Sequence, residues 1–194
     1  MSTDTSEKGL ETLIMRHMTG EAGLAVAPNM AAERLAPYGG TGHIAGSAQD
    51  YDRAHALDVP QLFAFLRATQ PESFKKLGMA NPDDPQDINR LKFLSRISGE
   101  CGGSKRGVID ALRKGVDHGP LHFDLFYGTP SPGNTKAEAL HAQNRFSITR
   151  QLAYSMDETR RTLDLCLFIN GLPIATFELK NSLTKQTVAD AVEQ

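Results

Sequence analysis

The stretch LDLCLFINGLPIATFELKN, residues 163–181, limits the possible folds of this chain more than any other segment. Two apolar runs flank the dipeptide Asn170-Gly171. Asn-Gly is the strongest short signal for a two-residue hairpin turn, because both turn residues need a positive φ. The segment therefore predicts two directly paired antiparallel strands, at about 163–169 and 174–180, within a sheet.

Three charged residues interrupt this apolar hairpin, namely Asp164, Glu178 and Lys180. Charged side chains are rarely buried in a sheet without partners. Pairing about a turn centred near position 171 puts Asp164 opposite Glu178, and facing residues have Cβ atoms about 4.5–5.5 Å apart. Lys180 follows Glu178 by two positions, so both residues lie on the same strand face. Two carboxylates this close repel each other unless a cation lies between them.

A hard divalent cation suits such a carboxylate pair. Mg²⁺ prefers oxygen ligands and commonly takes one or two carboxylates together with substrate phosphates. A neighbouring lysine can steady a nucleophilic water or the charge that develops on a phosphoryl group. This chemistry predicts Asp164 and Glu178 as metal ligands and Lys180 as their catalytic partner. A structural charge cluster at a sheet end stays open as an alternative, because the pattern Asp-x(n)-Glu-x-Lys is short.

Two parts of the chain before residue 116 are predicted to be helical. Apolar residues recur at helical spacing over about 7–18, which predicts an amphipathic helix there. A block at about 50–115 has helical periodicity throughout, and Asp58 with Pro60 provides a cap and a first-turn proline for one of its helices. This block is expected to form a large, wholly helical insertion.

The second half has the shorter period of strands. Residues 121–128 and 146–155 alternate between apolar and polar side chains. A last helix is expected at about 184–194, cut short by the end of the chain. The order of elements predicts an α/β (mixed α+β) fold over residues 1–194, with a central mixed sheet at about 120–180 and flanking helices.

Composition excludes several other classes of protein. The chain has 194 residues, 40% hydrophobic and 23% charged, which is ordinary for a globular domain. It has no apolar run near the ~18–20 residues of a membrane span, and its polar N-terminus has no signal core. Cys101 and Cys166 are far apart and lack any CxxC pattern, which favours a reducing, cytoplasmic setting.

Three other motifs fail on spacing or context. GGTGHIAG follows no predicted strand and has its last glycine one position late for a dinucleotide loop. GECGGSKRG has its serine and lysine in the wrong order for a P-loop. Cys101, His118, His122 and Cys166 match no standard zinc spacing.

Several segments resemble known proteins, and this similarity narrows the range of expected folds and functions. The set Asp164…Glu178-Leu179-Lys180, with a helix before and after it, resembles the core of the PD-(D/E)xK nucleases. NGLPIATFELKNSLTKQT is also similar to the nuclease domain of the restriction (motor) subunit of type I restriction–modification enzymes. NRFSITRQLAYS and SAQDYDRAHALDVPQLFAFLRATQPE resemble the same family. The resemblance extends over about residues 7–194 and implies a PD-(D/E)xK fold.

The resemblance also implies roles for particular residues. It implies metal binding by Asp164 and Glu178, with Lys180 completing the catalytic set. Glu11 occupies the place of the family's helix-borne acidic residue. Gln194 is the candidate for the glutamine of a motif on the following helix.

The implied activity is Mg²⁺-dependent cleavage of double-stranded DNA. ATP would serve only a motor domain that lies beyond this chain. The implied partners are DNA and the methylation and specificity subunits of a restriction complex. Two alternatives are kept: a non-catalytic DNA- or partner-binding module with a nuclease-like fold, and a stand-alone repair or junction nuclease of the same fold.

Overall fold

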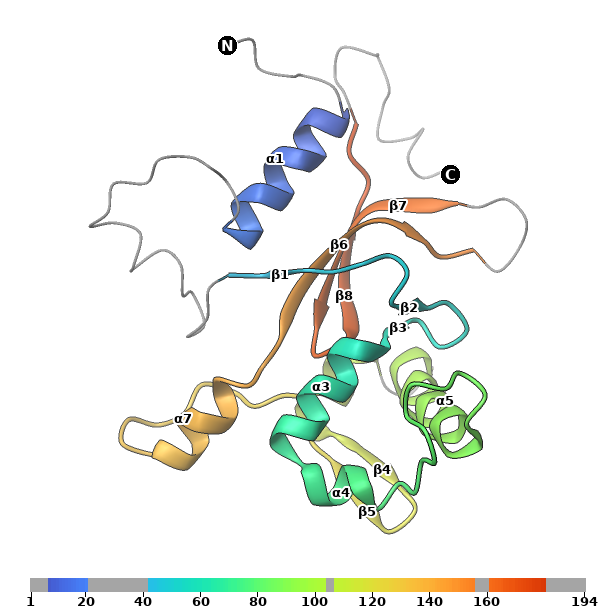
Figure 1. Ribbon diagram of the computed structural model, residues 1–194. Helices are drawn as coiled ribbons and strands as arrows, with labels where there is room; N and C mark the ends of the chain where they lie inside the picture. The colour runs from blue at the N-terminus through green and yellow to red at the C-terminus, as the bar shows by residue number, and fades with distance from the viewer. Residues whose placement is uncertain (1–6, 21–41, 104–106, 156–160, 181–194) are drawn as a thin grey trace.

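A mixed four-stranded sheet forms the centre of the molecule (Figure 1). The structure, a computed structural model, describes residues 7–20, 42–103, 107–155 and 161–180. The strand order is β1-β6-β7-β8, with β1 parallel to β6 and the other neighbours antiparallel. The strands are β1 (Ile44–Ala45), β6 (Phe146–Ala153), β7 (Thr162–Ile169) and β8 (Leu172–Phe177).

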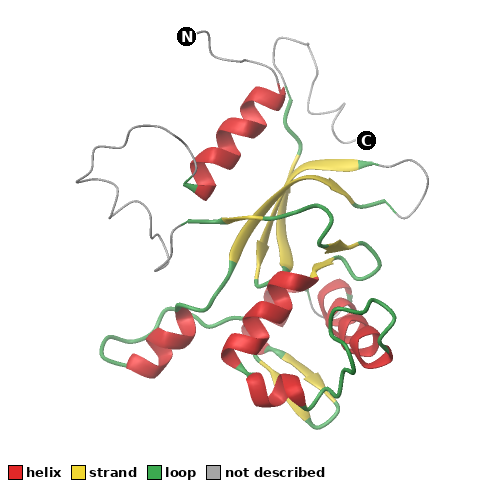
Figure 2. Cartoon of the chain, in the orientation of Figure 1, coloured by secondary structure: helices red, strands yellow, loops and turns green. Residues whose placement is uncertain are grey.

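Helices flank this sheet, as Figure 2 shows. They are α1 (Glu7–Thr19), α3 (Val59–Thr69), α4 (Pro71–Lys75), α5 (Ile88–Gly102), α6 (Val108–Lys114) and α7 (Thr135–His141). The arrangement confirms the expected α/β class with a mixed central sheet, while the finer assignment to the PD-(D/E)xK fold stays a prediction. Among the described residues, no helix has the length and apolar character needed to cross a membrane. The expected last helix, at 184–194, lies outside the described residues.

The hairpin predicted around Asn170-Gly171 is present. Both turn residues have a positive φ, 50° for Asn170 and 82° for Gly171. Leu165 pairs with Phe177, which is the register that the sequence predicted, and a bulge after Leu167 shifts the pairs nearer the turn by one residue. The predicted length of the second strand was wrong, because β8 ends at Phe177. Glu178 and Lys180 therefore lie just beyond the strand.

The hairpin turn is buried inside the molecule. Asn170 has no exposed surface. Its Oδ1 accepts a hydrogen bond from the Arg145 backbone N at 2.6 Å, and its Nδ2 donates to the Leu125 carbonyl at 2.8 Å. The Gly171 carbonyl accepts a hydrogen bond from the Asp58 backbone N at 2.9 Å. The turn thus joins the central sheet to the start of α3.

The block at 50–115 is not wholly helical, contrary to the sequence-based expectation. It opens with two short antiparallel strands, β2 (Tyr51–Asp52) and β3 (Leu57–Asp58), and its helices begin only at Val59. A two-residue strand is too short to show any period in the sequence. Asp58 does cap α3 as expected, because its Oδ1 accepts a hydrogen bond from the Gln61 backbone N at 3.2 Å.

The strand predicted at 121–128 is also shorter than expected. It appears as β5 (Leu121–Phe123), paired with β4 (Val116–His118), which the sequence pattern did not reveal. The strand ends because a side chain replaces the ladder partner. Gln70 donates to the Asp124 carbonyl at 2.8 Å and accepts from the Asp124 backbone N at 3.0 Å.

The main apolar core lies between the helical block and the closed end of the hairpin. Its fully buried side chains include Phe65, Leu66, Phe93, Leu94, Phe123 and Leu172. Leu172 is the first residue of β8, so the central sheet contributes directly to the core of the helical block. A separate small cluster of Leu152, Cys166 and Phe168 packs elsewhere on the sheet.

Candidate active site at the open end of the hairpin

Asp164 is a half-buried residue near the start of β7, at the end of the hairpin opposite to its turn. Its Oδ2 accepts a hydrogen bond from the Leu179 backbone N at 2.6 Å. Its Oδ1 lies 3.4 Å from Nε2 of Gln151. The first of these bonds holds the chain segment that follows β8 against β7, and so brings the ELK motif to Asp164.

Glu178 meets Asp164 at this end of the hairpin. Burial raises the pKa of the Glu178 carboxyl above its usual value. The charge of Asp164, a side-chain hydrogen bond to Asp164 and the charge of Glu7 raise this pKa further, while the charge of Lys180 lowers it. Two carboxylates and one lysine therefore share one electrostatic environment, and the two acids favour sharing a proton or a cation.

Glu11 joins the same neighbourhood from α1. Its side chain is buried, whereas Leu10 and Leu13 of the same helix are 41% and 52% exposed. Oε2 of Glu11 accepts a hydrogen bond from Gln151 Nε2 at 2.7 Å, and its Oε1 lies 3.9 Å from Nη1 of Arg150. A helix that buries an acid and exposes leucines departs from the usual pattern of globular helices. The departure indicates that the carboxylate of Glu11 has a role at this site other than packing.

The structure brings together four of the five candidate residues. Glu11, Asp164, Glu178 and Lys180 are linked through the contacts given above, and their chemical roles stay predictions. Gln194 lies outside the described residues.

The sequence pattern does not reveal Gln151, although this residue contacts two of the candidate carboxylates. It follows Arg150 on β6, where the register of the flanking pairs sets it across from Asp164. Residues 154–161 connect the two strands without a two-residue turn signal. The sequence therefore offered no means of fixing the register between β6 and β7.

The donor set suits a hard cation. Asp164 and Glu178 supply carboxylate oxygens, which Mg²⁺ prefers, and one or two protein carboxylates are its usual share in phosphate chemistry. Within the described ranges, no group of three or more Asp, Glu, His or Cys side chains is arranged to hold a metal ion. The described residues therefore fit a cation that two carboxylates hold, with its remaining coordination positions open to water and phosphate.

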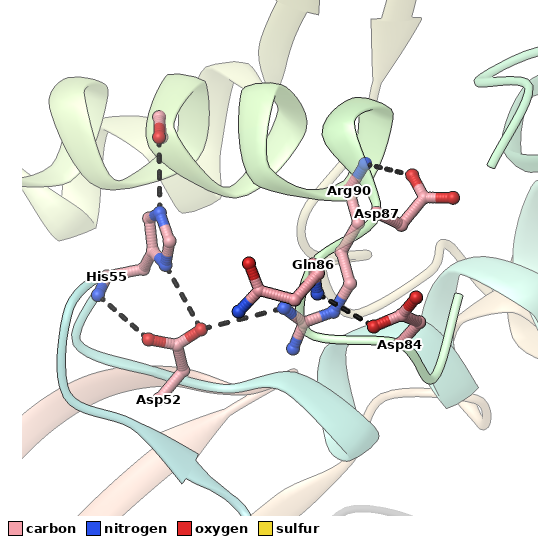
Figure 3. A network of polar contacts seen from close by, with 7 residues as sticks. Asp52, His55, Asp84, Gln86, Asp87 and Arg90 are labelled. Atoms are coloured by element: carbon pink, nitrogen blue, oxygen red, sulfur yellow. Dashed lines mark hydrogen bonds and ion pairs between the residues drawn. The ribbon is translucent and has the colours of Figure 1, made fainter. Parts of the chain in front are cut away.

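A second polar network, also missed from the sequence, lies between the β2–β3 turn and α5 (Figure 3). His55 Nδ1 is 3.1 Å from Asp52 Oδ2, and His55 Nε2 is 3.1 Å from Ser95 Oγ. The order Asp–His–Ser is that of a serine hydrolase relay. Ser95, however, lies in the interior of α5, where its backbone N–H belongs to the helix. It therefore lacks the neighbouring backbone donors that stabilise an oxyanion.

The same network has a structural role that accounts for its geometry. Arg90 is nearly buried and has Nη1 3.9 Å from Asp52 Oδ2. His55 donates its backbone N–H to Asp52 Oδ1 at 3.2 Å. These contacts join the β2–β3 turn to α5, and half-buried Asp52 supplies a countercharge for the buried Arg90 side chain.

The chain is an α/β domain that carries an acidic site at one end of its mixed sheet. Residues 105–194 match the family model described as type I restriction enzyme R protein N terminus. This part of the chain belongs to that family, and it contains Asp164, Glu178 and Lys180. Glu11 and the rest of residues 1–104 lie outside the match, which is narrower than the resemblance seen in the sequence. No curated protein and no solved structure matches the chain.

Proposed function

We propose that this chain is the DNA-cleaving domain of a type I restriction enzyme R subunit and hydrolyses phosphodiesters of double-stranded DNA with Mg²⁺. The observation that carries the proposal is the meeting of Asp164 and Glu178 beside Lys180, inside the segment that belongs to the R protein family. Family membership alone supports a part in a restriction system. The carboxylate pair adds a specific chemical reason for nucleic-acid hydrolysis.

In this proposal Asp164 and Glu178 hold the cation. When bound, the cation supplies positive charge that stabilises the phosphoryl group and lowers the pKa of a water molecule. The raised pKa of Glu178 has a direct consequence, because the carboxyl must lose its proton before it binds a cation. Protons therefore compete with the cation for Glu178, and cation binding should weaken as the pH falls.

Lys180 has two tasks in this proposal. Its ammonium group lowers the pKa of Glu178, and so favours the ionised form that binds a cation. The same charge is suited to hold a nucleophilic water or to stabilise negative charge on the phosphate in the transition state. Glu11 contributes from α1 a third acidic side chain, buried and hydrogen-bonded toward the pair.

The full-length subunit, assembled with its methylation and specificity partners, would deliver DNA to this site by an ATP-driven motor. The chain described here has a net charge of −2. Non-specific affinity for DNA comes mainly from neutralised phosphates, so the chain alone should bind duplex DNA weakly. Efficient cleavage by the chain alone would favour a stand-alone nuclease instead.

The test is cleavage of plasmid DNA by the full-length subunit in its complex, with Lys180→Ala beside wild type. Lys92→Ala, at an exposed lysine of α5, is the matched control. We expect the Lys180 variant to lose cleavage but to keep ATP hydrolysis, and the control to cut normally. Mg²⁺ or Mn²⁺ should support cleavage, and Ca²⁺ should not. Cleavage at the wild-type rate by the Lys180 variant would leave the non-catalytic binding module as the better account.

A further inference from the structure

Gln151 has an unusual backbone for its place in a strand. Its φ is +50°, a left-handed conformation that residues other than glycine adopt rarely and at an energetic cost. The β6–β7 ladder pairs Arg150 with Leu165 and Leu152 with Leu163, but skips Gln151 itself. Strained backbone of this kind tends to persist where it serves a site.

Two neighbouring side chains of β6, those of Arg150 and Gln151, contact the same acid. Neighbouring residues of a regular strand point to opposite faces of the sheet. Here Arg150 and Gln151 both contact Glu11, at 3.9 Å and 2.7 Å. The register places Gln151 opposite Asp164, on the same face of the sheet, and from there its amide also reaches Glu11.

The amide of Gln151 spans two acids. Its Nε2 lies 2.7 Å from Glu11 Oε2 and 3.4 Å from Asp164 Oδ1. Both partners are acceptors when ionised, so the side chain must present its NH₂ group to them. A neutral amide with two N–H groups can link two carboxylates without neutralising either, so both keep the charge that attracts a cation.

We propose that Gln151 is a positioning residue that holds the Glu11 carboxylate near Asp164, so that Glu11 adds negative charge around the cation that Asp164 and Glu178 hold. This inference rests on the proposed function of the site. Gln151 acts through Glu11, because its shorter hydrogen bond is to that residue. Glu11 in turn joins the site from a helix far away in the sequence.

The test is a set of Mn²⁺ titrations of the full chain, followed by the electron paramagnetic resonance signal of free Mn²⁺. The key variant is Gln151→Gly, which removes the amide and keeps the left-handed backbone available. We expect it to weaken Mn²⁺ binding about tenfold, in the range usual for residues that orient metal ligands. Gln143→Gly, at an exposed glutamine away from the site, should leave binding unchanged.

A double-mutant cycle with Glu11→Gln separates positioning from a general structural effect. If Gln151 acts through Glu11, the double variant should bind Mn²⁺ no more weakly than Glu11→Gln alone. Additive losses, or wild-type affinity in Gln151→Gly, would overturn the inference. Thermal unfolding followed by circular dichroism checks that the variants are folded. Should Gln151→Gly prove unstable, Gln151→Asn retains tolerance of a positive φ but has a shorter reach, and the same tenfold loss is expected.

Failure of this inference is distinct from failure of the proposed function. Asp164→Asn and Glu178→Gln are titrated in the same series. If these two variants bind Mn²⁺ as wild type does, the metal site itself is wrong and the role of Gln151 falls with it. If they lose binding while Gln151→Gly retains it, only the positioning role is wrong.

Discussion

The two ends of the β7–β8 hairpin are built from the same pair of strands but from opposite kinds of chemistry. At the closed end, Asn170 and Leu172 are fully buried, and the Asn170 side chain bonds to backbone groups of two other segments. At the open end, Asp164 and Glu178 face each other, and the Glu178 pKa is raised. At the closed end, each polar group has a hydrogen-bond partner. At the open end, two groups that carry the same charge lie close together.

This difference separates stability from function along a single element. Paired, buried polar groups stabilise a fold because each has a hydrogen-bond partner. Close carboxylates raise the free energy of the ionised folded state, and such arrangements cluster at functional sites. The buried, hydrogen-bonded closed end anchors the hairpin in the helical core, and this anchoring fixes where the open end presents its acids.

The largest effect is expected at the open end, on cleavage. Glu178→Gln removes one cation ligand and should lower the cleavage rate of the full complex by on the order of 10²–10³-fold or more. The free energy of unfolding should not fall, because the substitution also removes repulsion with Asp164. Plasmid cleavage and urea unfolding, measured on the same variant, check both parts. A variant that is markedly destabilised would show that the open end also stabilises the fold.

The next effect is expected at the closed end, on stability. Asn170→Ala leaves the Arg145 N–H and the Leu125 carbonyl without their partner and places alanine at a positive φ. Such changes cost about 3 kcal/mol in free energy of unfolding. Chemical denaturation measures the loss, with Gln143→Ala as a surface control expected to change little. A loss below about 1 kcal/mol would contradict the role given to this turn.

We expect the free energy of unfolding to depend on pH through Asp58, which lies where the hairpin turn meets α3. Burial raises the pKa of its carboxyl to about 6, from 3.8. The folded state thus holds the proton more tightly than the unfolded state, and loses stability as pH rises from about 4 to about 6. A shift of this size corresponds to about 3 kcal/mol.

Asp58→Asn keeps an N-cap oxygen and removes this titration. Its free energy of unfolding should lack the decline of wild type between pH 4 and pH 6, so that the variant is the more stable protein at pH 7. Denaturant unfolding across this pH range makes the comparison. Parallel curves for the two proteins would show that Asp58 keeps an ordinary pKa.

The smallest effect is expected for the ion pair between Arg150 and Glu11 beside the site. Arg150 is 54% exposed at its side chain and lies 3.9 Å from Glu11. The exposed Arg150 guanidinium is screened by water and salt, and the buried Glu11 carboxylate keeps its hydrogen bond to Gln151, so Arg150→Gln should change the free energy of unfolding by less than about 0.5 kcal/mol. Thermal unfolding at low and high salt measures this. A larger, salt-sensitive loss would show that Glu11 depends on charge pairing rather than on the Gln151 amide.

The sequence predicted the hairpin well because its information is local. Asn170-Gly171 fixes both the turn type and the register, and the register brings Asp164 near Glu178. It overestimated β8, because the Leu179 amide bonds to the Asp164 side chain rather than to a strand. A pattern of apolar and polar residues does not reveal that kind of competition.

Other features could not be predicted from the sequence, because they depend on contacts between segments that are far apart in the chain. Gln151 became visible only through its contacts with α1 and β7. The two-residue strands β2 and β3 are held by their surroundings and have no period of their own. The buried environment of Asn170 likewise depends on Arg145 and Leu125, which no short motif connects to the turn.

The most direct test of the division between the two ends compares Asp164→Asn with Leu172→Val in one single-turnover cleavage experiment. The rates, measured with Mg²⁺ in the full complex, are expressed per folded molecule. Leu172→Val trims a buried side chain and should cost about 1 kcal/mol of stability. The account predicts that Asp164→Asn is folded and does not cut, while Leu172→Val is less stable and cuts at the wild-type rate. Near-normal cleavage by Asp164→Asn, or loss of cleavage in folded Leu172→Val, would contradict it.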